Sequence, residues 1–269
     1  MDFILVATFG LVFGSFFNVL ADRLSYGKTI LGRSKCESCK HQLSWNDLIP
    51  VLSFILLKGK CRYCKKSFSI QYPLSEIFTS AVFILTWYLS NHYLLGFVRE
   101  DIFIHMLYLA TSGVLIVMLL ADLRYQIIPD EMQVALGVIG LTKIIYISYF
   151  IAGGNYIRIF TDLWSGVLSG AIVMAPLLLV FLITKGRGMG FGDVKLTFVM
   201  GLFLGMWQGL GALYIGFVTG GVVGAILLLL KLGGRKTKIP FGPYLILGFY
   251  LMIFFEQEVY TIVSRVYGF

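Results

Sequence analysis

The chain has 269 residues, of which 58% are apolar and only 13% are charged, and its mean hydropathy is +0.85. Because about a quarter of the residues in soluble domains are charged, this composition excludes a soluble globular protein and indicates a polytopic membrane protein. The net charge of +8 does not call for nucleic acid as a partner, since basic residues accumulate in the cytoplasmic loops of membrane proteins.

Eight apolar runs approach the roughly 17 to 25 residues that a helix needs to span a bilayer. They cover residues 3–21, 73–90, 102–121, 131–151, 162–184, 196–207, 209–230 and 242–263. The stretch 196–230 is rich in glycine and is compatible with two short helices or with one helix and a re-entrant segment. We therefore expect an all-α membrane protein with about eight transmembrane helices.

The first run predicts a retained helix rather than a cleaved signal peptide, because Asp2 precedes it and no basic residue does. We expect three regions: a first transmembrane helix (1–21), a cytoplasmic loop (22–72) and a transmembrane helical core (73–269).

Charge alternates between the successive loops. Most lysines and arginines fall in segments 22–72, 122–130, 185–195 and 231–241. By the positive-inside rule these loops are cytoplasmic, which places the N-terminus outside. Attraction to anionic membrane lipid then accounts for the basic charge. The same parity puts Asp122 and Asp193 on the cytoplasmic side, where they can meet.

The first loop contains two Cys-x-x-Cys pairs, Cys36 with Cys39 and Cys61 with Cys64. Two such turns can present four thiolates to one tetrahedral ion, and a reducing cytoplasm disfavours disulfides. We expect a structural zinc site, because four cysteines leave no open coordination position; redox pairs and free thiols are the alternatives. His41 is close enough in sequence to replace one cysteine.

Two acidic motifs stand beside apolar runs: ADLRYQIIPD, which contains Asp122, and GMGFGDVK, which contains Asp193. An ionisable side chain next to hydrocarbon is costly unless it is used. Two neighbouring carboxyls can supply a charged base and a protonated acid, the groups needed to hydrolyse a peptide bond without a covalent intermediate. The glycines before Asp193 would let a substrate approach closely.

Structural interpretations compete with the catalytic one. Asp122 can pair with Arg124, and Asp193 can pair with Lys195. We interpret Asp130 as the N-cap of the helix that follows it rather than as an acid.

The sequence closely resembles the type IV prepilin leader peptidases, membrane aspartic proteases of the Gly-x-Gly-Asp class. The resemblance covers nearly the whole chain. It is carried by GSFFNVLADRL from Gly14, WNDLIPVLSFILLKGKCRYC with SIQYPLSE in the cysteine loop region, the two acidic motifs, and IPFGPYL from Ile239.

This resemblance implies that Asp122 and Asp193 are the catalytic pair and that the four cysteines bind the metal. It implies cleavage of the basic leader of prepilins or pseudopilins at the cytoplasmic face of the bacterial inner membrane, in pilus assembly or protein secretion. It also implies methylation of the new N-terminus from S-adenosylmethionine, with Gly59 and Glu76 as candidates for the cofactor region.

A different class of function is a proton-coupled transporter that uses Asp122, Lys143 and Asp193 as a relay. It leaves the cysteine loop unexplained, and no inverted repeat is visible in the sequence. A third interpretation is an assembly scaffold without chemistry, against which both acidic motifs argue.

Overall fold

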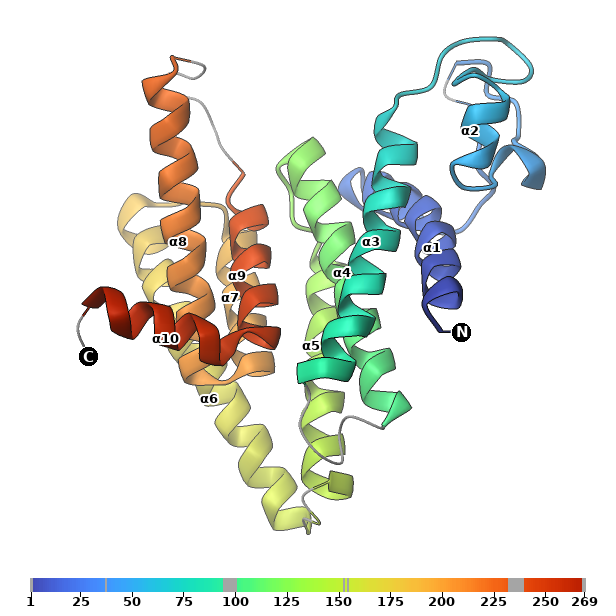
Figure 1. Ribbon diagram of the computed structural model, residues 1–269. Coiled ribbons are helices and arrows are strands. Elements are labelled where there is room, and N and C mark those ends of the chain that lie inside the picture. Colours follow the sequence, from blue (N-terminus) through green and yellow to red (C-terminus); the bar gives the residue numbers. More distant parts are fainter. Residues whose placement is uncertain are drawn as a thin grey trace.

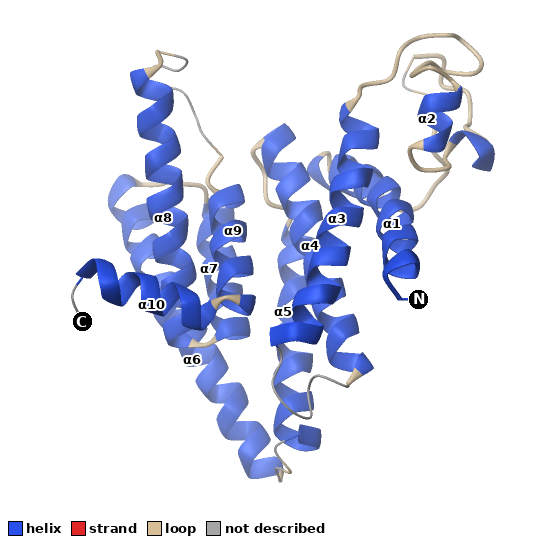
Figure 2. Cartoon of the chain, viewed as in Figure 1, coloured by secondary structure: helices blue, strands red, loops and turns tan. Residues whose placement is uncertain are grey.

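The computed structural model describes residues 2–36, 38–93, 101–151, 153, 155–231 and 240–267. Within these residues the regular structure is helical, apart from two isolated β-bridges, which confirms the all-α prediction (Figure 2). The α-helices are α1 (Asp2–Ser25), α2 (Leu52–Leu56), α3 (Gln71–Tyr93), α4 (Ile102–Tyr125), α5 (Asp130–Tyr146), α6 (Tyr156–Thr184), α7 (Phe191–Leu204), α8 (Met206–Leu229), α9 (Gly242–Phe254) and α10 (Glu256–Tyr267).

The eight predicted apolar runs are helical, but 196–207 runs past the end of α7 and 242–263 is divided between α9 and α10, and eight membrane spans are not confirmed. Among the described residues, five helices are long and apolar enough to cross a membrane: α1, α4, α5 with its continuation to Phe150, α6 and α8. A sixth span results if α9 and α10 are counted as one, although they meet at an angle of 104°. The run 196–207 falls short because α7 has only 14 residues. Helix α3 is long enough but is not among the five, because polar residues such as Glu76 and Thr79 make it less apolar.

The helices form two groups that meet along α4, α5, α7 and α9 (Figure 1). In one group α1 packs on α3 and both contact α4; in the other, α6 packs on α7 and α8 packs on α9. The cysteine loop, with the short helix α2, lies beyond the first turn of α3 (Figure 1). The contacts of α5 with α7 and of α4 with α9 bring the two acidic motifs to the same part of the molecule.

Close backbone approach sets the position of α1 against α3. A Cβ atom at Gly14 would lie 2.7 Å from the Cα atom of Glu76, and one at Gly10 would lie 2.5 Å from the Cα atom of Ser80. Only glycine permits helices to pack this tightly, as the four-residue spacing predicts. The packing places the buried Glu76 directly against α1.

The short helix α7 ends inside the bundle, where Lys143 of α5 meets it. The Nζ atom of Lys143 donates to the main-chain oxygen of Phe203 at 3.2 Å and lies 4.4 Å from the centre of that ring. A cation at a helix C-terminus is favourable, because carbonyls of the last turn lack helical partners. The half-buried charge of Lys143 therefore has a structural role that needs no proton relay.

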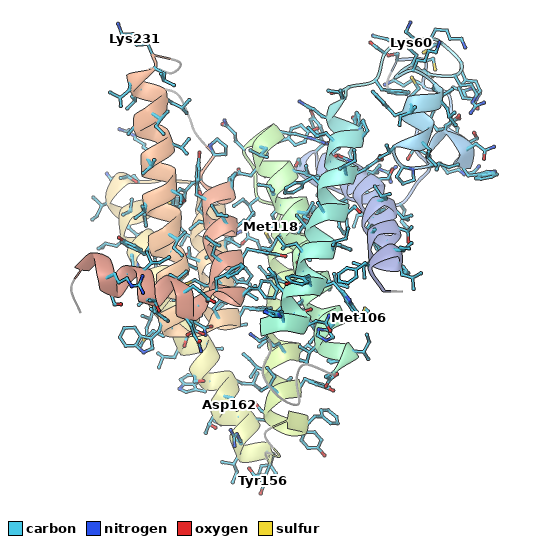
Figure 3. The ribbon with its side chains drawn as sticks, in the orientation of Figure 1. Lys60, Met106, Met118, Tyr156, Asp162 and Lys231 are labelled. Atoms are coloured by element: carbon cyan, nitrogen blue, oxygen red, sulfur yellow. The ribbon has the colours of Figure 1, made fainter. Side chains whose placement is uncertain are left out.

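The two ends of the molecule differ in the residues that they present. Lys60 of the cysteine loop and Lys231 after α8 lie at one end, and Tyr156 and Asp162 of α6 lie at the opposite end (Figure 3).

Candidate active site and cysteine loop

Asp122 lies in the last turn of α4 and is only 5% exposed. The helix ends just after it because Gln126 is left-handed, with φ 54°, and donates its N–H to the carbonyl of Asp122 at 2.9 Å. Within the described residues, the carboxylate oxygen Oδ2 is buried without a hydrogen-bond partner. The main-chain amide of Gly242, the first residue of α9, interacts with this carboxyl.

Asp193 lies in the first turn of α7 and is half-buried. Ile128 lies against the residue before Asp193 and against Gly242, which contacts Asp122. A Cβ atom at Gly192 would lie 3.4 Å from the Cβ atom of Ile128, and one at Gly242 would lie 3.3 Å from its Cδ1 atom. The segments that carry the two carboxyls approach the same side chain, Ile128. The structure thus brings both sequence-predicted acids to one site, formed by α4, α7 and the start of α9.

Neither aspartate has the basic partner that the structural interpretation predicted. Arg124 pairs with Asp22 at 2.9 Å, and Lys195 pairs with Asp130 at 2.8 Å. The prediction that Asp130 caps α5 is wrong: the cap is Pro129, and the carboxylate of Asp130 is held by Lys195 instead. The nearby cations therefore bind other acids. Among the residues that the structure describes, no ion pair includes Asp122 or Asp193.

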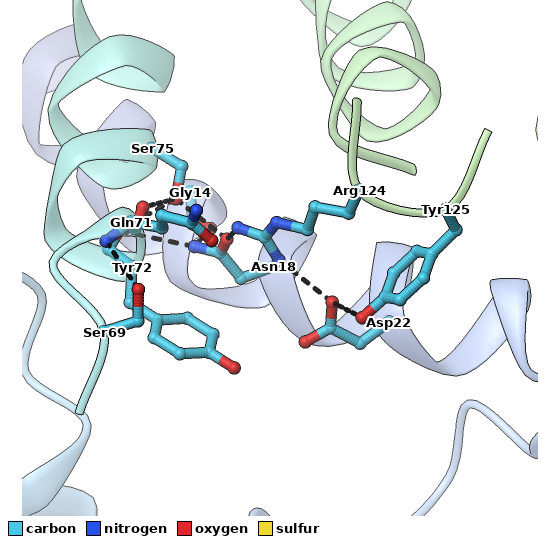
Figure 4. A network of polar contacts seen from close by, with 9 residues as sticks. All are labelled: Gly14, Asn18, Asp22, Ser69, Gln71, Tyr72, Ser75, Arg124 and Tyr125. Atoms are coloured by element: carbon cyan, nitrogen blue, oxygen red, sulfur yellow. Dashed lines mark hydrogen bonds and ion pairs between the residues drawn. The ribbon is translucent and has the colours of Figure 1, made fainter. Parts of the chain in front are cut away.

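Arg124 connects the end of α4 to α1 through a polar network (Figure 4). Its guanidinium donates to Asp22 at 2.9 Å and to Asn18 at 2.6 Å. The hydroxyl of Tyr125 also donates to Asp22, at 2.9 Å, and Ser75 of α3 donates to Asn18 at 2.8 Å. The network fixes the last turn of α4, which carries Asp122, against α1 and α3.

The four cysteines of the loop converge, as their spacing predicts. Their Sγ atoms all lie within 4.8 Å of one another, and those of Cys36 and Cys64 are 3.9 Å apart. Zinc–sulfur bonds of about 2.3 Å in a tetrahedron place sulfurs about 3.8 Å apart, so the donor set and its spacing fit a closed tetrahedral metal site. His41 stacks on Tyr63, with ring centroids 3.7 Å apart, and lies outside this cluster.

The two Cys-x-x-Cys turns have the same local geometry. Lys40 and Lys65 each have a positive φ, and each donates its N–H to the carbonyl of the first cysteine of its turn. In the first turn, hydrogen bonds from the main chain of Cys39 and Ser38 lower the pKa of Cys36 to about 6, whereas burial and the hydrogen bond with Cys36 raise the pKa of Cys39 to about 11. A lowered thiol pKa favours the thiolate, which is the form that binds metal.

A cavity of about 610 Å³ separates the cysteine loop from α1 and α3. Glu76 lines it and accepts a hydrogen bond at 2.8 Å from the main-chain N–H of Val51, which has a strained φ of 60°. Gly59 does not line the cavity but contacts Phe54, which does. Its φ is 68°, and a Cβ atom at this position would lie 2.9 Å from the ring of Phe54. The wall next to the helices includes Asn18 and Asp22 of the Arg124 network.

Comparison with known proteins matches both halves of the chain. Residues 8–90 match the bacterial peptidase A24 N-terminal domain, and residues 109–225 match the type IV leader peptidase family. A protein of Stutzerimonas stutzeri named prepilin leader peptidase/N-methyltransferase is 30% identical over 96% of this chain and 93% of its own length. The chain belongs to the type IV leader peptidase family.

Relatives with the same printed name occur in other bacteria. The protein of Legionella pneumophila is 31% identical over 85% of this chain and 74% of its own length, and that of Bacillus subtilis is 27% identical over 93% of each. No solved structure matches the chain. These matches confirm the resemblance found in the sequence and give no support to a transporter.

Two residues near the site of this leader peptidase family member escaped prediction from the sequence. Gly242 touches Asp122 from 120 positions away, and its only local signal was the motif IPFGPYL, to which no role was assigned. Asp22 binds Arg124, 102 positions away, and not its neighbour Arg23. Arg23 instead donates to the carbonyls of Ile30 and Gly32.

Proposed function

We propose that this chain is an aspartic endopeptidase that removes the leader of type IV prepilins or pseudopilins and methylates the new N-terminus. The observation that carries the peptidase activity is the juxtaposition of Asp122 and Asp193 while Arg124 and Lys195 bind other acids. Two carboxyls at such a site do not both ionise easily, so one retains a proton near neutral pH.

In this mechanism the ionised carboxylate takes a proton from water, whose oxygen attacks the carbonyl carbon of the scissile peptide. The protonated carboxyl gives its proton to the leaving nitrogen, so the carbon–nitrogen bond breaks without a covalent enzyme intermediate. Two glycines lie against these carboxyls: a Cβ atom at Gly242 would lie 2.5 Å from Oδ2 of Asp122, and one at Gly190 would lie 3.3 Å from Oδ2 of Asp193.

The substrate class follows from family membership and from the printed names of the relatives. We place the protein in the bacterial inner membrane with its N-terminus outside and both aspartates facing the cytoplasm, because the basic loops lie on that side. Its partners are then prepilins or pseudopilins and the surrounding lipid, with no part for nucleic acid.

For the four cysteines we propose structural zinc. The equivalent turns and the sulfur spacing support a closed site without a coordination position for water. A metal here would stabilise the loop 22–72, which contains only short helical segments. We retain the division into a first helix (1–21), this loop and a peptidase core (73–269).

For the methyl donor we propose the cavity between the loop and the helices. Its volume lies in the range of about 300–1,000 Å³ that is typical of small-molecule sites. S-adenosylmethionine carries a sulfonium and an ammonium group, which the carboxylate of Glu76 would attract, and a carboxylate, which the lysines and arginines of the lining would attract; Phe54 and Tyr72 offer aromatic surface. When bound, it would supply the methyl group. Gly59 would act indirectly, by allowing Phe54 to pack.

The test is mass spectrometry of a prepilin N-terminus after incubation with the purified, lipid-reconstituted protein and S-adenosylmethionine. We expect Asp122→Asn and Asp193→Asn to leave the leader uncleaved, and Asp162→Asn, at the opposite end of the molecule, to cleave normally. Glu76→Gln should cleave the leader but leave more of the product unmethylated. Normal cleavage by both aspartate variants would refute the peptidase assignment.

A further inference from the structure

Gln133 lies in the first turn of α5 and is 3% exposed. Its side-chain nitrogen Nε2 donates to the main-chain oxygen of Gly192 at 3.3 Å and to that of Ile128 at 3.5 Å. Gly192 directly precedes Asp193, and Ile128 belongs to the segment that leads from Asp122 to α5. One amide group therefore joins the two chain segments that carry the aspartates.

The acceptor side of the same amide is unused. Within the described residues, Oε1 of Gln133 is buried and has no hydrogen-bond partner. The orientation of the amide is fixed, because two carbonyl oxygens face Nε2 and would repel an oxygen in its place. A buried polar atom without a partner is destabilising, and an apolar side chain of the same shape can be nearly neutral for folding. Fold stability alone thus gives little reason for glutamine here.

We propose that Gln133 is a positioning residue of the peptidase site. Its two N–H contacts set the distance and orientation of the Asp193 segment relative to the Asp122 segment, and Ile128 packs in the space between them. Among the described residues, Gln133 forms no hydrogen bond with either carboxylate. It therefore acts through the main chain of Gly192. This inference rests on the proposed peptidase function.

The contact explains how α5 takes part in a site whose two acids lie on α4 and α7. The ion pair of Lys195 with Asp130 joins the same two elements, but Asp130 is 66% exposed and Lys195 is 39% exposed. Solvent-exposed ion pairs contribute little to stability. Of these two polar links between α5 and the first turn of α7, the amide of Gln133 is the one that is buried.

The experiment compares Gln133→Met with the wild type and with Gln208→Met, which places the same side chain at a partly buried glutamine of α8. Each protein is reconstituted in lipid, and kcat and KM are measured for cleavage of a prepilin. Misplacing reacting groups by about 1 Å can cost about 100-fold in rate. We expect kcat of Gln133→Met to fall 10-fold to 100-fold with KM within about threefold of the wild type.

Two further measurements separate positioning from folding. Gln133→Met should melt within about 4 °C of the wild type, a change of the size that about 1 kcal/mol produces, and should methylate a pilin that has already lost its leader. Gln133→Glu, which keeps the shape but replaces the Nε2 donors, should also lose kcat. Wild-type kcat in Gln133→Met would overturn the proposal, as would a loss of cleavage, methylation and melting temperature together. Failure of the wild type to cleave prepilin would instead refute the proposed function.

Discussion

A Cβ atom at position 242 would lie 2.5 Å from Oδ2 of Asp122 and 3.1 Å from its Cγ, so only glycine leaves this carboxylate where it is. Gly242 begins α9, and its amide interacts with the carboxyl from the N-terminal end of that helix. Helix N-termini favour negative charge. The start of α9 thus borders the candidate active site as well as beginning a helix.

Gly242→Ala should reduce kcat for cleavage by about 100-fold, because the added methyl group forces the carboxylate of Asp122 out of position. The overlap is with the end of a side chain that can rotate, so we expect the melting temperature to change little. Gly221→Ala is the matched control, since a Cβ atom there meets nothing within 4 Å. The measurement is prepilin cleavage in lipid vesicles, and full activity in Gly242→Ala would show that Asp122 does not need this position.

Removal of the metal should separate the two activities. Cys61 is fully buried, so we expect elemental analysis to find zinc in the wild type and not in Cys61→Ser, and we expect this variant to lose the methylation that we assign to the cavity. Cleavage should fall less, because the aspartates lie on α4 and α7. His41→Ala should keep the metal, since His41 stacks on Tyr63 outside the cluster. Loss of zinc in His41→Ala, or its retention in Cys61→Ser, would contradict the assignment of the ligands.

The ion pair of Arg124 with Asp22 should contribute measurably to stability, because its side chains are only 16% and 25% exposed. We expect Arg124→Gln or Asp22→Asn to lower the free energy of unfolding by about 1–3 kcal/mol, with a coupling energy of about 1 kcal/mol in a double-mutant cycle. The pair Arg158 and Asp162, 3.8 Å apart and about half exposed, is the control, with an expected coupling of about 0.3–0.5 kcal/mol. Equal coupling in both cycles, measured by unfolding in mixed micelles, would contradict the role of burial.

Local patterns in the sequence predicted much of this structure. Long apolar runs predict helices because backbone groups in a bilayer must be satisfied within the segment. The spacing of Cys36, Cys39, Cys61 and Cys64 predicted their convergence, since each turn brings two thiols together on its own. Loop charge predicted that the Asp122 and Asp193 motifs share one side of the membrane.

Contacts between distant segments could not be predicted in the same way. Arg124 binds Asp22 across 102 positions, although Asp122 is two residues away, because both residues of the pair lie where α4 packs on α1. Residue type alone does not tell which of several acids a base will meet. The angle between α9 and α10 also escaped prediction, because residues 242–263 form one apolar run in the sequence.

Helices α7 and α9, which begin beside the two aspartates, are too short to cross a membrane on their own. They have 14 and 13 residues, so each is about 20 Å long, against a hydrocarbon layer of about 30 Å. Both begin at the aspartates, and α9 is followed by α10, which turns by 104° and begins with Glu256, Gln257 and Glu258. Most side chains of both helices are buried against longer neighbours such as α6 and α8, so α7 and α9 can end within the depth of the bilayer without facing lipid there.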